Sequence, residues 1–169
     1  PSDHSAGYFA IKRFDRAQKA DGTHRYHMVS AGGLLETSHR IPNLDYDVLM
    51  KLTLRLTDSL DEVEALYRLM AFNVVVGNRD DHAKNFTYLY RDDRWSLSPA
   101  YDLTQNSGMN GEHATTVGGK GRAITFEDVV GVGVRAGMGP SRARSVAREI
   151  EDTARECLAD TMVLPGLSA

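Results

Sequence analysis

NRDDHAKNF at residues 78–86 and SPAYDLT at residues 98–104 are the two stretches that decide how this chain is interpreted. Within the first stretch, Asn85 lies five positions after Asp80. The second stretch supplies Asp102, beyond a pair of short apolar segments that alternate like a β-hairpin. The chain therefore offers two separated carboxylates and one amide near each other in the sequence, and their chemistry depends on how the neighbouring segments fold.

The segment before the first stretch predicts an amphipathic helix at residues 60–76. Ser59 with Glu62 three positions later is a capping-box pattern, which marks a helix start. Apolar residues then recur on one helical face, at Val63, Leu66, Tyr67, Met70 and Val74. Gly77 is suited to end the helix. We therefore expect a rigid element that delivers the chain into the polar loop and holds its side chains still.

The rest of the chain predicts an α+β fold that is mainly α. Apolar content and alternation favour strands at residues 8–14, 23–29, 86–90 and 94–97, the last two forming a hairpin. Helical spacing favours a helix at residues 45–56, with Asp45 as its cap, and another at residues 143–158. A further helix is expected to begin at Thr125, where Asp128 completes a capping box. Residues 15–22 indicate a loop, and residues 105–121 a long mobile loop. Within the latter, GGKGR at residues 118–122 lacks the spacing of a Walker loop.

Composition restricts the chain to a globular protein with one domain. It has 169 residues and an apolar fraction of 41%, enough for one buried core. The formal charge is −3 and the pI is about 6.1, so no global positive field favours nucleic acid or an anionic membrane. The single cysteine, Cys157, suits a reducing compartment, and no apolar run indicates a membrane span or a secretory signal. We therefore expect a cytoplasmic location.

The order of the polar groups favours phosphoryl transfer from a magnesium nucleotide. Arg79 directly precedes Asp80, and Asn85 completes the R-D-x-x-x-x-N spacing of a kinase catalytic loop. Such chemistry needs one carboxylate to accept the proton of the attacking hydroxyl, and an amide and a second carboxylate to hold magnesium. We assign these roles to Asp80, Asn85 and Asp102, respectively.

The spacing leaves the roles of three neighbouring residues open. Lys84 could reach the transferring phosphate as a point charge. His82 is either a packed structural histidine or a contact to nucleotide. Asp81 has no required role in this scheme and is expected to face solvent. The alternative for the whole loop is that Asp and Asn serve only turn geometry, which both residues favour.

Three segments, in order, resemble the HipA-type toxin kinases, bacterial Ser/Thr kinases of toxin–antitoxin modules. They are AIKRFDR at residues 10–16, GNRDDHAKNF at residues 77–86 and LSPAYDLT at residues 97–104. The resemblance implies the carboxyl-terminal lobe of a protein-kinase-like fold. Residues 1–29 would be the hinge strand and the edge of the amino-terminal lobe, and residues 30–169 the helical lobe. Within it, residues 78–86 would be the catalytic loop and residues 98–104 the metal-binding segment.

The same resemblance implies which residues bind ATP and Mg²⁺. Asp80 would be the catalytic base, and Asn85 and Asp102 the magnesium ligands. The other nucleotide-site residues would be Lys12, Arg13 and Phe14 in the hinge, together with His82, Lys84 and Tyr101. Kinases of this kind place a phosphate-covering loop and a phosphate-binding lysine before the hinge, whereas this chain begins only eleven residues before Lys12. We therefore expect a fragment or a companion chain, and an isolated chain of weak activity.

The resemblance also implies the partners. The substrate would be a protein, such as an aminoacyl-tRNA synthetase or another translation factor, and a HipB-like helix-turn-helix antitoxin would bind the kinase. DNA would be contacted only through that complex, and no membrane is expected. Arginines on the last predicted helix could touch DNA phosphates, but interleaved acids favour a solvated face outside the apolar stripe. These residues are Arg142, Arg144, Arg148 and Arg155, with Glu149, Glu151, Asp152 and Glu156.

Three other classes of function remain as alternatives. A small-molecule kinase, of the kind that modifies aminoglycosides or choline, uses the same acid-to-amide spacing. A nonenzymatic pseudokinase or interaction lobe would lose the metal ligands, and both are present here. A metal phosphohydrolase built on His82 would need several histidines around a bare metal ion. The other histidines are scattered, at His4, His24, His27, His39 and His113.

Overall fold

Short strands and longer helices alternate along the chain. A computed structural model describes residue 8, residues 10–37 and residues 44–158. In chain order the elements are β1 (Arg16–Lys19), β2 (Gly22–Arg25), β3 (His27–Ser30), α1 (Ala31–Leu34), β4 (Leu44–Asp45), α2 (Tyr46–Thr57), α3 (Leu60–Val76), the 3-10 helix η1 (Ala83–Asn85), β5 (Thr87–Arg91), β6 (Arg94–Leu97), β7 (Thr115–Thr116), α4 (Phe126–Arg135) and α5 (Pro140–Leu158). No helix within these ranges has the length and apolar character needed to cross a membrane.

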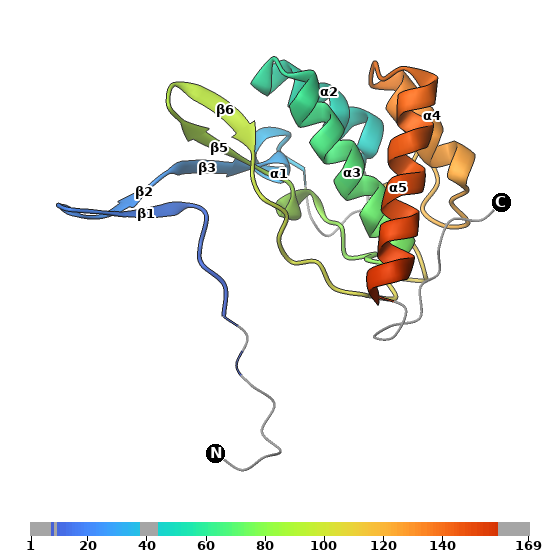
Figure 1. Ribbon diagram of the computed structural model, residues 1–169, viewed down its shortest axis with the longest axis horizontal. Helices are drawn as coiled ribbons and strands as arrows, with labels where there is room; N and C mark the ends of the chain where they lie inside the picture. Colours follow the sequence, from blue (N-terminus) through green and yellow to red (C-terminus); the bar gives the residue numbers. More distant parts are fainter. Residues whose placement is uncertain (1–7, 9, 38–43, 159–169) are drawn as a thin grey trace, which may run out of the picture.

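The strands form one three-stranded sheet and two smaller pairs. β5 lies between β3 and β6 and is antiparallel to both, with Tyr88 opposite Val29 on one side and Leu97 on the other. β1 and β2 form a separate hairpin, while the short strands β4 and β7 pair in parallel. Figure 1 shows this sheet at one end of the molecule and helices α2 to α5 at the other, with the β1–β2 hairpin beyond the sheet.

Helix α3 is the centre of the helical part. It contacts α2, α4 and α5, and Leu66, Tyr67 and Met70 on it are fully buried. Ser59 accepts a hydrogen bond from the backbone N–H of Glu62 at its start. The Glu62 carboxylate in turn accepts a hydrogen bond of 2.9 Å from the backbone N–H of Leu97. This contact fixes α3 to β6, and so joins the helices to the sheet.

Most of the predicted elements are confirmed, and so is the α+β class. Helices occur at each of the four predicted places, and β5 and β6 form the predicted hairpin. The caps are also as predicted: Asp45 accepts a hydrogen bond from the backbone N–H of Asp47, and Thr125 with Asp128 forms a complete capping box. Caps depend on residues three or fewer positions apart, which is why the sequence displays them.

The beginning of the chain differs from the prediction of a strand at residues 8–14 followed by a loop at residues 15–22. Of the predicted strand, residue 9 lies outside the described residues, and the others have no strand structure. The first strand is β1, inside the predicted loop, and it returns as β2 with Gly22 in a positive-φ conformation. The side chains of β1 and β2 are polar and mostly exposed, so apolar alternation gave no signal there.

Residues 105–121 are anchored to the rest of the chain, contrary to the prediction of a mobile loop. Strand β7 within this segment pairs with β4. The backbone N–H of Asn106 donates to the carbonyl of Gly77 at 3.0 Å, and that of Gly119 donates to the Asp45 carboxylate at 2.7 Å. All three contacts join residues that are far apart in the sequence, so a local search for periodicity could not find them.

Helix α5 buries one acid that the sequence placed on its solvated face. Glu151 is only 4% exposed, and its two oxygens accept hydrogen bonds of 3.0 Å from Arg148 and 2.9 Å from Arg155. The two remaining arginines pair with acids of other helices, Arg142 with Glu64 and Arg144 with Glu127. All four arginines therefore have carboxylate partners among the described residues.

Close packing of α4 predicts that Gly133→Ala destabilises the fold. A Cβ at Gly133 would lie 2.8 Å from the Tyr67 ring and 2.9 Å from the Cβ of Ala143. Overpacking of this kind lowers the free energy of unfolding by about 1–3 kcal/mol. Gly131→Ala is the control in the same helix, because its Cβ would meet the movable end of the Arg135 side chain. Urea unfolding that gives both variants the same stability would contradict the prediction.

Candidate active site

The loop at residues 78–86 begins where α3 ends, and backbone bonds hold it against residues 105–121. Gly77 closes α3 in the left-handed conformation, with φ of 69°. Asn78 then forms a parallel bridge with Asn106. One residue further, the backbone N–H of Ala114 donates to the carbonyl of Arg79 at 3.1 Å. The two loops are therefore one bonded unit at the end of α3.

Asp80 lies at the surface of this unit. Its side chain is 40% exposed, and Oδ1 lies 3.0 Å from Nε2 of His82. Its backbone carbonyl accepts two hydrogen bonds of 2.9 Å, from the backbone N–H of His82 and from Nδ2 of Asn85. The structure thus brings Asp80, His82 and Asn85 together and leaves the Asp80 carboxylate accessible.

Tyr101 connects the second polar stretch to this loop. Its hydroxyl donates to the backbone carbonyl of Lys84 at 2.7 Å and accepts from Thr87 Oγ1 at 3.2 Å. Its ring centre lies 5.7 Å from that of Phe14. Burial raises the pKa of Tyr101, and the charge of the neighbouring Asp102 raises it further, so the hydroxyl remains a donor at neutral pH. Phe14, Tyr101 and the backbone beside Asn85 are therefore in one series of contacts.

The remaining predicted site residues are more exposed. Asp102 and Lys84 are exposed, and Asp102 has a left-handed backbone with φ of 57°. Lys12 is exposed on the irregular segment before β1, which runs outside the sheets in Figure 1. Arg13 donates two hydrogen bonds of 2.7 Å to Asp15. Within the described part of the chain, no hydrogen bond or ion pair joins Lys12 or Arg13 to the loop that carries Asp80.

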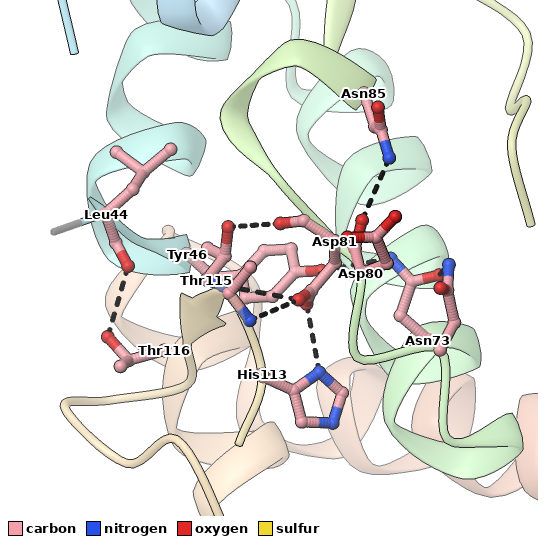
Figure 2. Close-up of polar contacts among 11 residues, drawn as sticks. Leu44, Tyr46, Asn73, Asp80, Asp81, Asn85, His113, Thr115 and Thr116 are labelled. Atoms are coloured by element: carbon pink, nitrogen blue, oxygen red, sulfur yellow. Dashed lines mark hydrogen bonds and ion pairs between the residues drawn. The ribbon is translucent and has the colours of Figure 1, made fainter. Parts of the chain in front are cut away.

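Asp81 is buried, so the prediction that it faces solvent is wrong. Its side chain is 0% exposed and lies at the centre of the contacts in Figure 2. Oδ2 accepts from the Tyr46 hydroxyl at 2.9 Å and lies 3.0 Å from Nδ1 of His113. Oδ1 accepts from the backbone N–H groups of Ala114, at 2.9 Å, and Thr115, at 3.2 Å. One carboxylate therefore joins the start of α2, the loop at 78–86 and the segment at 113–115.

Further side-chain bonds extend this network back into α3. Asn73 donates from Nδ2 to the Tyr46 hydroxyl at 3.0 Å, and Asn78 donates to Oδ1 of Asn73 at the same distance. Burial raises the pKa of Tyr46 well above its ordinary value, and the charge of Asp81 acts in the same direction. The hydroxyl therefore stays protonated and can donate to Asp81. No sequence signal revealed this set, because its members come from four separate segments.

A cleft of about 570 Å³ opens beside Asp80. We call it the acidic-loop cleft, and its walls are residues 79–80, His82 and parts of the segment 106–114. Met109 on its rim is 73% exposed, whereas His113 in its wall is 5% exposed. The cleft thus places the accessible carboxylates of Asp80 and Glu112, one buried imidazole and the apolar side chain of Met109 around a space of the size that small ligands occupy.

Asn85 and Asp102 supply oxygen atoms of the kind that Mg²⁺ prefers. The bond from Asn85 Nδ2 to the Asp80 carbonyl orients the amide and leaves Oδ1 as the free acceptor. One amide and one carboxylate fit a magnesium ion that keeps waters and binds nucleotide phosphates. Among the described residues, which exclude His4 and His39, no group of three or more His, Cys, Asp or Glu could hold a metal ion.

Comparison with known proteins places the chain in a family. A family model described as the HipA-like C-terminal domain matches residues 2–158. The chain belongs to the HipA-like C-terminal domain family. The computed structure also matches a HipA chain from a complex of Shewanella oneidensis HipA, HipB and operator DNA, with a TM-score of 0.71 and 16% identity over 88% of this chain. The expected fold, that of the HipA carboxyl-terminal lobe, is therefore confirmed.

The curated relatives are named as kinases. "Putative kinase Y4mE" of Sinorhizobium fredii is 30% identical over a match that covers 86% of this chain and 40% of the relative. "Putative kinase Y4dM" of the same organism is 35% identical over 95 residues, or 56% of this chain and 22% of the relative. The chain spans 40% of the HipA chain as well. It therefore corresponds to less than half the length of each of these proteins.

The buried network predicts that Asp81→Asn is strongly destabilising. Asparagine would present an amide group to several donors, so at least one buried donor would lose its acceptor. Loss of a buried charged acceptor of this kind lowers the free energy of unfolding by about 3 kcal/mol. Asp93→Asn, the same change in the exposed turn between β5 and β6, should cost less than about 0.5 kcal/mol. Chemical denaturation compares the two, and similar midpoints would contradict the importance of Asp81.

Proposed function

We propose that this HipA-like domain is the catalytic lobe of a Ser/Thr protein kinase that uses ATP and Mg²⁺. The observation that carries the proposal is the bonded frame around Asp80. Asn85 donates to the backbone of Asp80, and Tyr101, next to Asp102, donates to the backbone of Lys84. The frame supports a common site because it links the backbones that carry all three oxygen-bearing side chains.

Asp80 acts as the general base in this proposal. Its carboxylate accepts a hydrogen bond from the hydroxyl of a Ser or Thr in the substrate and takes the proton as transfer proceeds. The hydroxyl oxygen forms a bond to the γ-phosphorus of ATP while the bond to the ADP oxygen breaks. His82, 3.0 Å from the carboxylate, orients Asp80.

Asn85 and Asp102 hold magnesium in this proposal, through one amide and one carboxylate oxygen. A magnesium ion held there would neutralise the charge that develops on the phosphates. Lys84, one residue before Asn85, adds a positive charge on the same side. The packing of Phe14 against Tyr101 supports a position for Lys12, Arg13 and Phe14 beside the nucleotide, with the backbone of this segment bonding adenine.

The partners are proposed on the same basis. One solved structure that this chain matches is a HipA in complex with HipB and operator DNA. We infer a HipB-like helix-turn-helix antitoxin as the partner of the protein that carries this domain, with DNA bound through the antitoxin. The substrate is a protein, with translation factors such as aminoacyl-tRNA synthetases as the class to test.

Asp80→Asn should abolish transfer without unfolding the domain. Removing a general base lowers the rate by about 100-fold or more, while an exposed carboxylate contributes less than about 0.5 kcal/mol to stability. The measurement is transfer of labelled γ-phosphate by the protein that carries this chain, with Asp93→Asn as the matched control. Full activity of Asp80→Asn would assign the base to another residue. Absence of MgATP binding in the wild-type protein would favour the pseudokinase alternative.

A further inference from the structure

Asp80 and His82 line the acidic-loop cleft, and the other proposed nucleotide-site residues lie outside its walls. The cleft walls come from residues 79–80, His82 and the segment 106–114, whereas Asn85 and Tyr101 are outside them. Figure 2 shows Asp80 between Asn85 and His113. In phosphoryl transfer the attacking and leaving oxygens lie roughly in line, so the acceptor enters opposite the ADP group. The cleft is on the side from which an acceptor would approach.

His113 gives this cleft a fixed hydrogen-bonding group. Its side chain is 5% exposed, and Nδ1 lies 3.0 Å from the fully buried carboxylate of Asp81. Its backbone N–H donates to the carbonyl of Gly121 at 2.7 Å, which holds the residue from a second side. The Nδ1–H tautomer of His113 donates to the Asp81 carboxylate, and in this tautomer Nε2 is the acceptor of the ring.

No hydrogen bond engages Nε2 within the part of the chain that the structure describes. Figure 2 shows this nitrogen on the edge of the ring that points away from Asp81. Among the described residues, the buried side-chain polar atoms without a hydrogen-bond partner belong to Arg16, Thr37 and Asn78. His113 Nε2 is not one of them, so it is accessible, and the cleft that His113 lines is where a ligand would reach it. A nearly buried imidazole, oriented by Asp81 and open on one edge, is arranged to accept a hydrogen bond from a ligand.

We propose that the acidic-loop cleft binds the polypeptide segment that carries the phosphorylated hydroxyl, and that His113 Nε2 accepts a hydrogen bond from a main-chain N–H of that segment. This rests on the proposed kinase function. An extended polypeptide offers such an N–H whatever its sequence, and the exposed side chain of Met109 offers apolar contact at the rim. His113 is thus a substrate-binding residue, and Asp81 positions it.

His113→Asn separates this role from a structural one. The asparagine amide donates to Asp81 in place of Nδ1, but its side chain ends before the position of Nε2. Met109→Arg is a second variant, at an exposed position, that fills the mouth of the cleft and leaves the buried network intact. Lys120→Ala is the control, because it removes an ion pair with Asp128 in the same segment, outside the cleft.

The experiment uses the protein that carries this chain, with an arrayed library of Ser- and Thr-centred peptides as the acceptor probe. It compares kcat/KM for peptide phosphorylation, the rate of ATP hydrolysis without peptide, and the Kd of MgATP. His113→Asn should lower the peptide kcat/KM about 2- to 10-fold, the loss expected for one hydrogen bond. Met109→Arg should also lower it. Hydrolysis and MgATP affinity should stay unchanged in both, and Lys120→Ala should match the wild type.

The other outcomes overturn the inference. Unchanged peptide phosphorylation in both cleft variants, or an equal fall in peptide phosphorylation and hydrolysis, would remove the cleft from acceptor binding. Weaker MgATP binding in the variants would place the nucleotide in the cleft instead. A wild-type protein that hydrolyses ATP but phosphorylates no peptide would refute an extended acceptor segment while leaving the kinase function standing. A wild-type protein that neither binds MgATP nor hydrolyses ATP would refute the kinase function itself.

Discussion

The buried carboxylate of Asp81 is the constraint on which the candidate site depends. It accepts hydrogen bonds from Tyr46 at the start of α2 and from the backbone of Ala114 and Thr115, and it holds the ring of His113. A charge removed from water is costly unless its oxygens are satisfied, so the surrounding donors cannot move independently. The network therefore specifies how the loop at the end of α3 sits against residues 113–115.

Asp80 and Asp81 are adjacent in this loop, but they lie in opposite environments and have different roles. Asp81 points inward and organises the structure, whereas Asp80 points outward beside His82 and remains accessible. Consecutive residues in an extended stretch direct their side chains to opposite faces, so one short segment can serve both purposes. The exposed acid thereby gains a rigid support without being buried itself, as a reactive group requires.

The sequence was most informative where structure is local. Ser59, Thr125 and Gly77 mark helix ends through contacts with near neighbours, and the sequence predicts each of these helix ends. Asp81 is predicted to face solvent, wrongly, because its partners are distant in the sequence. Glu151 is predicted to lie on a solvated face, wrongly, because that face of its helix is polar in composition. In the sequence His113 is one of several scattered histidines, because no residue near it along the chain indicates that Asp81, 32 positions away, holds its ring. The predicted roles of Asp80, Asn85 and Asp102 remain predictions.

By itself, the sequence determined the helices, the hairpin, the family and the set of polar residues at the end of α3. The helices and the hairpin follow from periodicity and capping, which operate over short distances along the chain, and the family follows from the resemblance of three segments to HipA-type kinases. Only the tertiary structure decided which acid is buried, that residues 105–121 close over the loop, and that a cleft opens beside Asp80. Those features arise because segments far apart in the sequence supply hydrogen-bond partners for each other's polar and charged groups. No local pattern encodes such pairings.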